Sequence, residues 1–568
     1  MNQLNYNEFM KKVKEQISEY SIDDFHNIIF NWAKKEKPSE RDEFLNRLIP
    51  VQTDFDFKIK PKMLLDDISG FYKRVEDGYY YEGWGWDNEL HMEREWGDES
   101  WAEEMDEFLA ESRYLALSGN YEAAEKAYKM LFRILQFGEE DIGHLPGDPD
   151  YENMLEEELD EHVTLLLRAV YINSDIEERV ENFYKAWNEY SYMAGYDFKL
   201  TEVLEAEDKT LPELDIFLQN WIDYLLNQNS YDSSLIREAA WLKGGIDEIS
   251  KLAENYPERF PEAYLDWIDA LKKKNEGDTI LEVIKKGLSR VPKDYTIRAK
   301  IGERLTEFGE YQNDPKLQLK GLKESFYSNP GLEYLIALYI KASELNSFDI
   351  IKDECEQRIK YLINNDKNQD DFFKDEPKLS SAAEAHLINA LLLSADYEKA
   401  FELCKDDEIL KNNYTDRIKT LFISYMLAFL SSTEPGYPNI IYDVWGDNIK
   451  KSIYVMKRDY VAKYQKFAIE QMKQVSLSIK EQKYYTNWCQ KEVSQIIDGI
   501  VSNQQRGSYD KAANYLLAMA ETLVNKNGNR IGKKFVNKYL EKYPRHRAFK
   551  REVDQVLKKS KLFDLEAQ

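Results

Sequence analysis

Residues 115–135 read LALSGNYEAAEKAYKMLFRIL, and this stretch predicts two helices joined by a tight turn. Gly119 permits the turn because glycine carries no Cβ and tolerates backbone angles that other residues avoid. Ala124 allows two helices to approach closely, and Tyr121 and Tyr128 can fill the space between neighbouring hairpins. We therefore predict a helical hairpin, with Ala124 and Tyr128 buried where two helices meet.

The same spacing recurs twice later in the chain and once in a weaker form at 267–292. The clear copies are LLLSADYEKAFELC, which includes Ala400, and RGSYDKAANYLLAMA, which includes Ala512. The pattern resembles the turn and second helix of a tetratricopeptide repeat, and this resemblance implies stacked helical hairpins. Since the copies are degenerate and irregularly spaced, we expect irregular repeats rather than a regular superhelix. Ala400 and Ala512 should be buried in the same way as Ala124.

Helical periodicity dominates the rest of the sequence. One amphipathic series, at i, i+3, i+4, i+7 and i+11, consists of Leu214, Phe217, Leu218, Trp221 and Leu225. Period-two alternation never persists long enough to propose a sheet. The predicted fold class is therefore all-α, an irregular α-solenoid of tetratricopeptide-like hairpins with an acidic, aromatic-rich insertion and almost no strand.

A second resemblance covers segments 321–345, 380–405 and 505–556. These segments resemble the helical region found downstream of SWIM zinc fingers in bacterial proteins. The finger itself needs a CxC pair and a CxH pair, and this sequence contains neither. The resemblance therefore implies helical architecture only, and it implies neither zinc nor nucleic-acid binding.

Five regions follow from the breaks in composition, and they start with an N-terminal helical region at 1–75. The others are the acidic arm with the first hairpin at 76–200, helical repeats at 201–430, a linker at 431–448, and a C-terminal helical domain with a basic end at 449–568. The linker reads SSTEPGYPNIIYDVWGDN, in which Pro435 and Pro438 oppose helix formation.

Residues 76–111 form an acidic, aromatic segment with 14 acidic residues, one arginine and eight aromatic residues. Its YYYEGWGWD stretch indicates a loop or a loosely wrapped arm. One interpretation is a solvated acidic face whose tryptophans anchor it to adjacent helices. The other is a binding arm, because carboxylates mimic phosphate charge and tryptophan supplies rigid contact area. The candidate partner-binding residues here are Trp84, Trp86, Trp96 and Trp101.

The C-terminal end has the opposite charge. Residues 526–561 contain 13 lysines or arginines and three acidic residues. They could form a solvated face that offsets acidic neighbours in the same molecule, a docking patch for an acidic partner, or a site for RNA or DNA. Few aromatic residues are interleaved with these charges, which argues against nucleic acid. The candidate partner-binding residues are Lys533, Lys534, Arg545 and Arg547.

The whole chain carries a net charge of -28, which argues against a general role in binding polyanions. Its three cysteines form no CxxC pair and fit a reducing compartment. The N-terminus shows no signal peptide, and the longest apolar stretch is too short to cross a bilayer. We therefore expect a cytoplasmic protein without a membrane anchor.

Motifs for catalysis, cofactors and metals were not found in the sequence. GNRIGKK, at 528–534, has the wrong glycine spacing for a phosphate-binding loop, and neither GxSxG nor HExxH occurs. Glu158 and His162 have the i, i+4 spacing of metal ligands, but they lie in an acidic run where this spacing arises by chance. A distant Cys–His pair stays open, although nothing favours it. The prediction is that the protein is not an enzyme and holds no cofactor or metal.

The leading functional hypothesis is a non-enzymatic helical-repeat protein that acts by protein–protein binding, as a regulatory or scaffold component. Size, acidity and helical character also give a weaker resemblance to the accessory protein of type III-E CRISPR systems. That resemblance implies cleavage by a caspase-like (CHAT) protease and regulation of a sigma factor, and the matching bond would be Met456–Lys457. A third hypothesis is a nucleic-acid-binding module that uses the basic C-terminal end.

Overall fold

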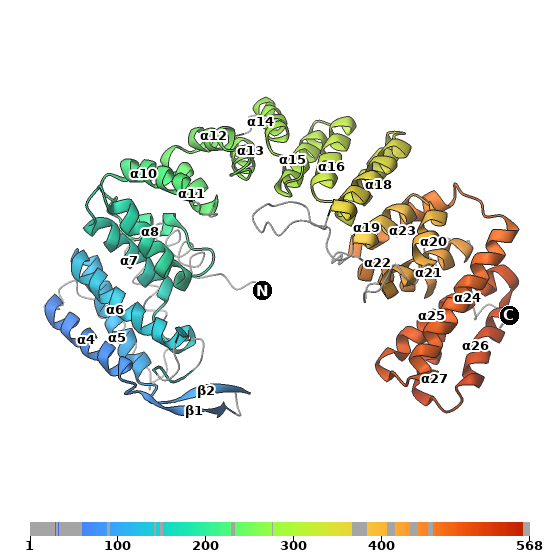
Figure 1. Cartoon of the computed structure of the whole chain (residues 1–568), viewed down its shortest axis with the longest axis horizontal. Helices are drawn as coiled ribbons and strands as arrows, with labels where there is room; N and C mark the ends of the chain where they lie inside the picture. The colour runs from blue at the N-terminus through green and yellow to red at the C-terminus, as the bar shows by residue number, and fades with distance from the viewer. Residues whose placement is uncertain are drawn as a thin grey trace. The chain divides into compact units, whose positions relative to one another are not determined.

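The computed structural model describes residues 29, 32, 34, 60–87, 91–140, 144–147, 151–228, 233–274, 277–365, 383–405, 415–431, 440–452 and 458–560. The chain divides into two compact units, residues 1–217 and 218–568. Helices account for nearly all of the regular structure in these residues, and consecutive helices pair as hairpins (Figure 1). The predicted all-α fold of irregular helical hairpins is confirmed.

The first unit contains one β-hairpin among its helices. Its elements are α4 (Pro61–Glu76), β1 (Tyr81–Asp87), β2 (Met92–Gly97), α5 (Trp101–Leu117), α6 (Tyr121–Glu140), η1 (Tyr151–Met154), α7 (Leu159–Asn173), α8 (Arg179–Tyr190), η2 (Ser191–Ala194) and α9 (Leu200–Glu205). Helix α10 (Leu214–Asn227) contains the boundary between the units.

All regular secondary structure among the described residues of the second unit is helical. Its helices are α11 (Ser233–Gly244), α12 (Ile246–Asn255), α13 (Ala263–Lys274), α14 (Gly277–Arg290), α15 (Ile297–Tyr311), α16 (Pro315–Ser328), α17 (Leu332–Glu344), α18 (Phe348–Asn365), α19 (Ala383–Leu393), α20 (Tyr397–Lys405), α21 (Thr415–Ser431), α22 (Ile440–Ser452), α23 (Arg458–Met472), α24 (Ile479–Ser502), η3 (Arg506–Ser508), α25 (Tyr509–Asn527), α26 (Asn529–Lys542) and α27 (Arg547–Lys559).

The three repeat-like motifs form the hairpins α5–α6, α19–α20 and α24–α25, as the sequence predicted. Each of these turns contains a residue with positive φ, but only the first is glycine: Gly119 at 85°, Ala395 at 55° and Gln504 at 54°. Gly507, which the motif places at the third turn, lies in η3 instead and does not adopt positive φ. Each interhelical turn therefore requires a residue with positive φ, but this residue need not be glycine.

The alanines and the tyrosine predicted to lie between the helices are indeed buried. None of these side chains exposes measurable surface, and the residues concerned are Ala124, Tyr128, Ala400 and Ala512. A small residue at the crossing lets the two backbones approach, and the tyrosine fills the adjacent space.

Helices α15 and α16 form the most closely packed hairpin among the described helices of the second unit. Two glycines allow their backbones to come this close. A Cβ at Gly302 would lie 2.8 Å from the carbonyl oxygen of Gly321, and one at Gly321 would lie 2.6 Å from that of Gly302. Since real Cβ atoms essentially never lie this close to a backbone oxygen, neither position accepts a side chain without separating the helices.

The structure differs from the prediction of a linker at 431–448. Ser431 ends α21, residues 432–439 lie outside the described residues, and α22 begins at Ile440. Ile441 and Trp445 are fully buried in the core that α16–α27 share. Both prolines precede residue 440, and the apolar spacing after them is that of a buried helix, so helix formation prevails there.

The structure also differs from the prediction for the acidic, aromatic segment. We expected a loop or a loosely wrapped arm, but β1 and β2 form a two-stranded antiparallel sheet (Figure 1). Tyr81, Trp84 and Trp86 on β1 and Trp96 on β2 favour strand structure, whereas glycines at 83 and 85 interrupt the alternation that would predict it. Among the helices that the structure describes, none is both long and apolar enough to cross a membrane.

Candidate binding surfaces

The β-hairpin is fastened to the first unit at one end. The backbone N–H of Asp98 donates to the carbonyl oxygen of Tyr80 at 2.8 Å, and the N–H of Gly147 donates to that of Glu95 at 3.2 Å. Gly97 leaves no room for a side chain, because a Cβ there would meet the Tyr80 carbonyl. Such anchoring matters because an isolated two-stranded sheet is at best marginally stable in water.

Trp101 belongs to this anchor and not to a binding surface, which corrects its assignment as a candidate partner-binding residue. It is the first residue of α5, its side chain is fully buried, and its indole N–H donates to the carbonyl oxygen of Pro146 at 2.7 Å. Burial is favourable here because the large apolar ring leaves water while its single donor finds a partner.

The two tryptophans of the YYYEGWGWD stretch lie on one face of the hairpin. Trp84 and Trp86 are two residues apart on β1, so their side chains project from the same side of the sheet. They remain 50% and 56% exposed. Their partners across the ladder are Glu95 and Glu93, so carboxylates accompany the indole rings on this face.

The opposite face carries Trp96 and Arg94, the single basic residue of the acidic segment. The guanidinium carbon of Arg94 lies 4.5 Å from the centroid of the Trp96 ring, and its Nη2 pairs with Glu99. Gly85 lies under Trp96, and a Cβ there would approach the indole nitrogen at 3.2 Å. Arg94 of the same chain thus covers part of the Trp96 ring, and Trp96 is 40% exposed.

The basic end forms a groove of ≈ 840 Å³ beside α26. Helix α26 supplies four cationic side chains to it, Arg530, Lys533, Lys534 and Lys538. Leu523 of α25, together with Ile531 and Phe535 of α26, adds apolar surface, and Glu541 is the single acidic residue of the lining.

Only half of the predicted basic residues belong to this groove. Lys533 and Lys534 line it, whereas Arg545 precedes α27 and Arg547 starts it, both exposed and outside the lining. Arg530 and Lys538 also line the groove and were not among the predicted residues, although their i, i+4 spacing to Lys534 places all three on one helix face.

The glycines of GNRIGKK, the sequence that does not fit a phosphate-binding loop, have structural roles beside this groove. Gly528 joins α25 to α26 with φ of 83°, and a Cβ at Gly532 would lie 2.9 Å from the carbonyl oxygen of Ala520 on α25. The two glycines thus serve a turn and a close helix contact, and the lysines after them face the groove.

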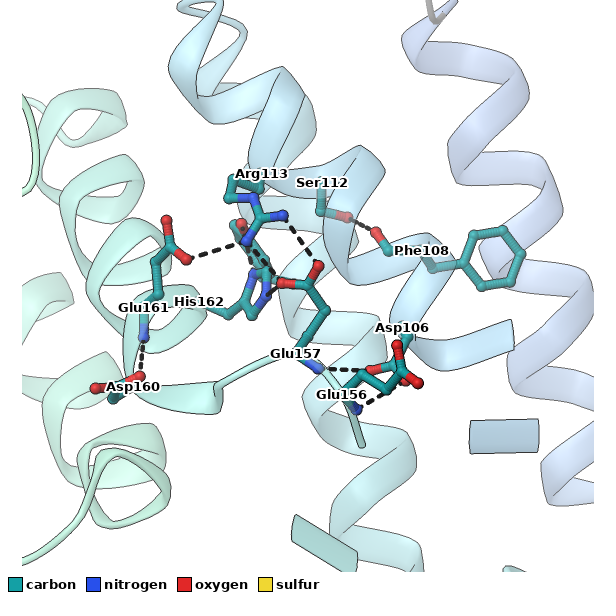
Figure 2. Close-up of polar contacts among 10 residues, drawn as sticks. Asp106, Phe108, Ser112, Arg113, Glu156, Glu157, Asp160, Glu161 and His162 are labelled. Atoms are coloured by element: carbon teal, nitrogen blue, oxygen red, sulfur yellow. Dashed lines mark hydrogen bonds and ion pairs between the residues drawn. The ribbon is translucent and has the colours of Figure 1, made fainter. Parts of the chain in front are cut away.

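A partly buried polar cluster connects α5, α6 and α7 in the first unit, and Figure 2 shows its contacts. Both Nη atoms of Arg113 contact the Glu157 carboxylate, at 2.6 and 2.9 Å, and Nη1 also pairs with Glu161 at 3.0 Å. His162 contacts Glu157 through Nε2 at 3.0 Å and the Tyr128 hydroxyl through Nδ1 at 3.2 Å.

The cluster links these helices through ion pairs and hydrogen bonds, and its imidazole does not reach solvent. His162 is fully buried, and burial lowers its pKa even though Glu157 opposes the shift. Its carboxylate partner is Glu157 rather than Glu158, the residue with metal-like spacing. Within the described ranges, no group of three or more His, Cys, Asp or Glu side chains is arranged to hold a metal ion.

The three cysteines are buried separately in the second unit, at Cys355, Cys404 and Cys489. Burial raises the pKa of each thiol, so these side chains stay protonated and act as small apolar groups. The bond between Met456 and Lys457, the candidate cleavage site, lies outside the described residues.

Comparison with known proteins adds no family. No family model matches the chain, and no curated protein matches it. Among solved structures, the chain is similar to a "circular tandem repeat protein with novel repeat topology and enhanced subunit contact surfaces", with 10% identity over 92% of this chain and 93% of that one. The TM-score is 0.15, so this likeness adds nothing to the fold seen in the helices themselves. Neither the SWIM-associated nor the CRISPR resemblance gains support.

Proposed function

We propose that this chain is a non-enzymatic helical-repeat protein that works by binding other proteins, as a regulatory or scaffold component. The observation that supports it most directly is the Trp84–Trp86 face of the β-hairpin. Two large rings stand half exposed on a rigid, anchored support, where burial in the chain's own core would have been favourable.

Physical chemistry favours a protein partner for this face. Tryptophan is the side chain most enriched among residues that dominate interface energies, because it buries a large area and freezes few rotamers. The accompanying Glu93 is exposed and adds a negative charge that can select a cationic surface. On the other face of the hairpin, Arg94 lies over the Trp96 ring and pairs with Glu99. This contact within the chain is an example of a cation that packs on a tryptophan beside a carboxylate.

Affinity purification of the tagged chain from its native host tests the proposal, with Trp84→Ser/Trp86→Ser compared with the unaltered protein. Both side chains are half exposed, so the variant should keep its circular dichroism spectrum and melting temperature. Trp241→Ser on α11 is the matched control, since Trp241 is 46% exposed and belongs to the second unit.

We expect recovery of at least one specific partner to fall about tenfold or more with the hairpin variant and to stay unchanged with the control. Equal recovery by all three proteins would contradict a role for this face. Turnover of a small molecule by the purified chain would contradict the non-enzymatic part of the proposal.

The two other hypotheses have no specific observation in their favour. The hypothesis of a CRISPR accessory protein depends on Met456 and Lys457, which lie outside the described residues. It also depends on a resemblance that no comparison supports. The nucleic-acid hypothesis depends on the basic end, where the aromatic ring that lines the groove, Phe535, is buried.

A further inference from the structure

The groove beside α26 carries a charge opposite to that of the whole chain. Four cations and one carboxylate line it in a protein whose net charge is -28. A cationic groove focuses attraction on negatively charged groups even when the surrounding molecule is acidic. Among the residues that the structure describes, no carboxylate forms an ion pair with Arg530, Lys534 or Lys538.

The charges are also arranged so that one extended ligand could meet them together. Arg530, Lys534 and Lys538 are spaced at i, i+4 and i+8, so they follow one side of α26. Helix α26 rises 1.5 Å per residue, so this row of cations spans about 12 Å. Successive carboxylates on a peptide can match such a row, whereas a single small anion would use only part of it.

The apolar residues in the groove restrict the class of ligand further. Ile531 is 43% exposed and lies beside the cations, while Leu523 and Phe535 are each 5% exposed. An apolar anchor on the ligand could cover Ile531 and remove that surface from water. Single-stranded nucleic acid needs accessible aromatic rings for base stacking, and the one ring in this lining is buried.

We propose that the α26 groove binds an acidic protein segment that carries an aliphatic or aromatic side chain between its carboxylates. The groove is a second site, on the other unit from the β-hairpin, and depends on the proposed function only in that both sites bind proteins. Loss of binding at one site therefore leaves the other site intact, and the two proposals fail separately.

Fluorescence anisotropy on the full-length chain tests this inference. The probe is a labelled short peptide in which Glu and Asp alternate with Leu and Phe, and its counterpart carries Gln and Asn instead. The test variant is Lys534→Glu/Lys538→Glu. The matched control is Lys316→Glu/Lys320→Glu on α16, another exposed i, i+4 lysine pair that changes the net charge equally.

We expect the acidic probe to bind the unaltered chain and the control, and to bind the test variant at least about tenfold more weakly. The neutral counterpart should not bind, and Ile531→Ser should weaken the acidic probe without a change in net charge. Added salt should weaken binding, since the contacts are between charged groups at an open surface.

Three results would overturn the inference. The first is equal binding of the acidic probe by the test variant and the control. The second is tighter binding of single-stranded RNA or inorganic polyphosphate than of the peptide, which would make the groove a polyanion site. The third is concentration-dependent self-association that the test variant abolishes, because the occupant would then be an acidic surface of a second copy.

Discussion

Glu521 on α25 should make the stability of the second unit depend on pH near neutrality. Its side chain is fully buried, and its carboxylate accepts from the backbone N–H of Ile441 at 3.2 Å and from the Ser560 hydroxyl at 2.5 Å. It therefore joins the start of α22 to the residue that follows α27. Burial is the largest influence on its pKa, which is raised from 4.5 to about 7, and Asp443 adds to the shift.

The sign and size of the effect follow from this shift. The folded chain holds the proton of Glu521 up to about pH 7, whereas the unfolded chain releases it near pH 4.5. Stability from this group is therefore complete below pH 4.5 and is lost as pH rises through 7. A shift of about 2.5 units at 1.36 kcal/mol per unit corresponds to a loss of about 3 kcal/mol.

Glu521→Gln removes the titration and keeps an oxygen that can accept from Ile441. Urea denaturation of both proteins, followed by circular dichroism between about pH 4 and about pH 9, isolates the contribution of this group because other titrations cancel in the difference. We expect the variant to gain about 3 kcal/mol relative to the unaltered chain across this range, with most of the gain between pH 4.5 and 7. A difference that is constant with pH, or that shrinks as pH rises, would refute the reasoning.

Three further predictions concern packing, and urea denaturation checks each one. Gly302→Ala should cost about 2–3 kcal/mol because its Cβ would collide with α16, whereas Gly499→Ala, with no atom within 4 Å, should be neutral or stabilising by up to about 1 kcal/mol. Ala395→Gly should stabilise the chain and Gly119→Ala should destabilise it, each by about 1 kcal/mol, because both residues have positive φ. Ala124→Trp should cost several kcal/mol, since a fully buried crossing cannot accept the ring; a loss below about 1 kcal/mol would place Ala124 outside a close contact.

The sequence alone predicted the class of fold and the positions of its principal hairpins. These predictions succeeded because helical amphipathicity and the close-packed alanine are local features, readable within a few turns of chain. Ala124, Ala400 and Ala512 are buried where their spacing placed them. The charge segregation was equally visible, and two of its lysines do line the basic groove.

Errors arose where a local signal competed with a distant contact. Pro435 and Pro438 suggested a linker, yet Trp445 lies in a core that brings together residues far apart in the sequence. Trp101 was grouped with the exposed tryptophans by proximity in the chain, and its contact with Pro146 is what separates it from them. Neither contact partner could be inferred from spacing.

Sequence by itself therefore determined that this chain forms helical hairpins, because periodicity and small residues act within each hairpin. Tertiary structure decided which side chains of a suggestive segment are available to a partner. It placed Trp84 and Trp86 on one face of a sheet, turned Trp101 inward, and lined the basic groove with residues of α24, α25 and α26. The physical reason is that exposure and charge neighbourhood depend on surfaces contributed by distant segments, and these surfaces exist only once the chain has packed.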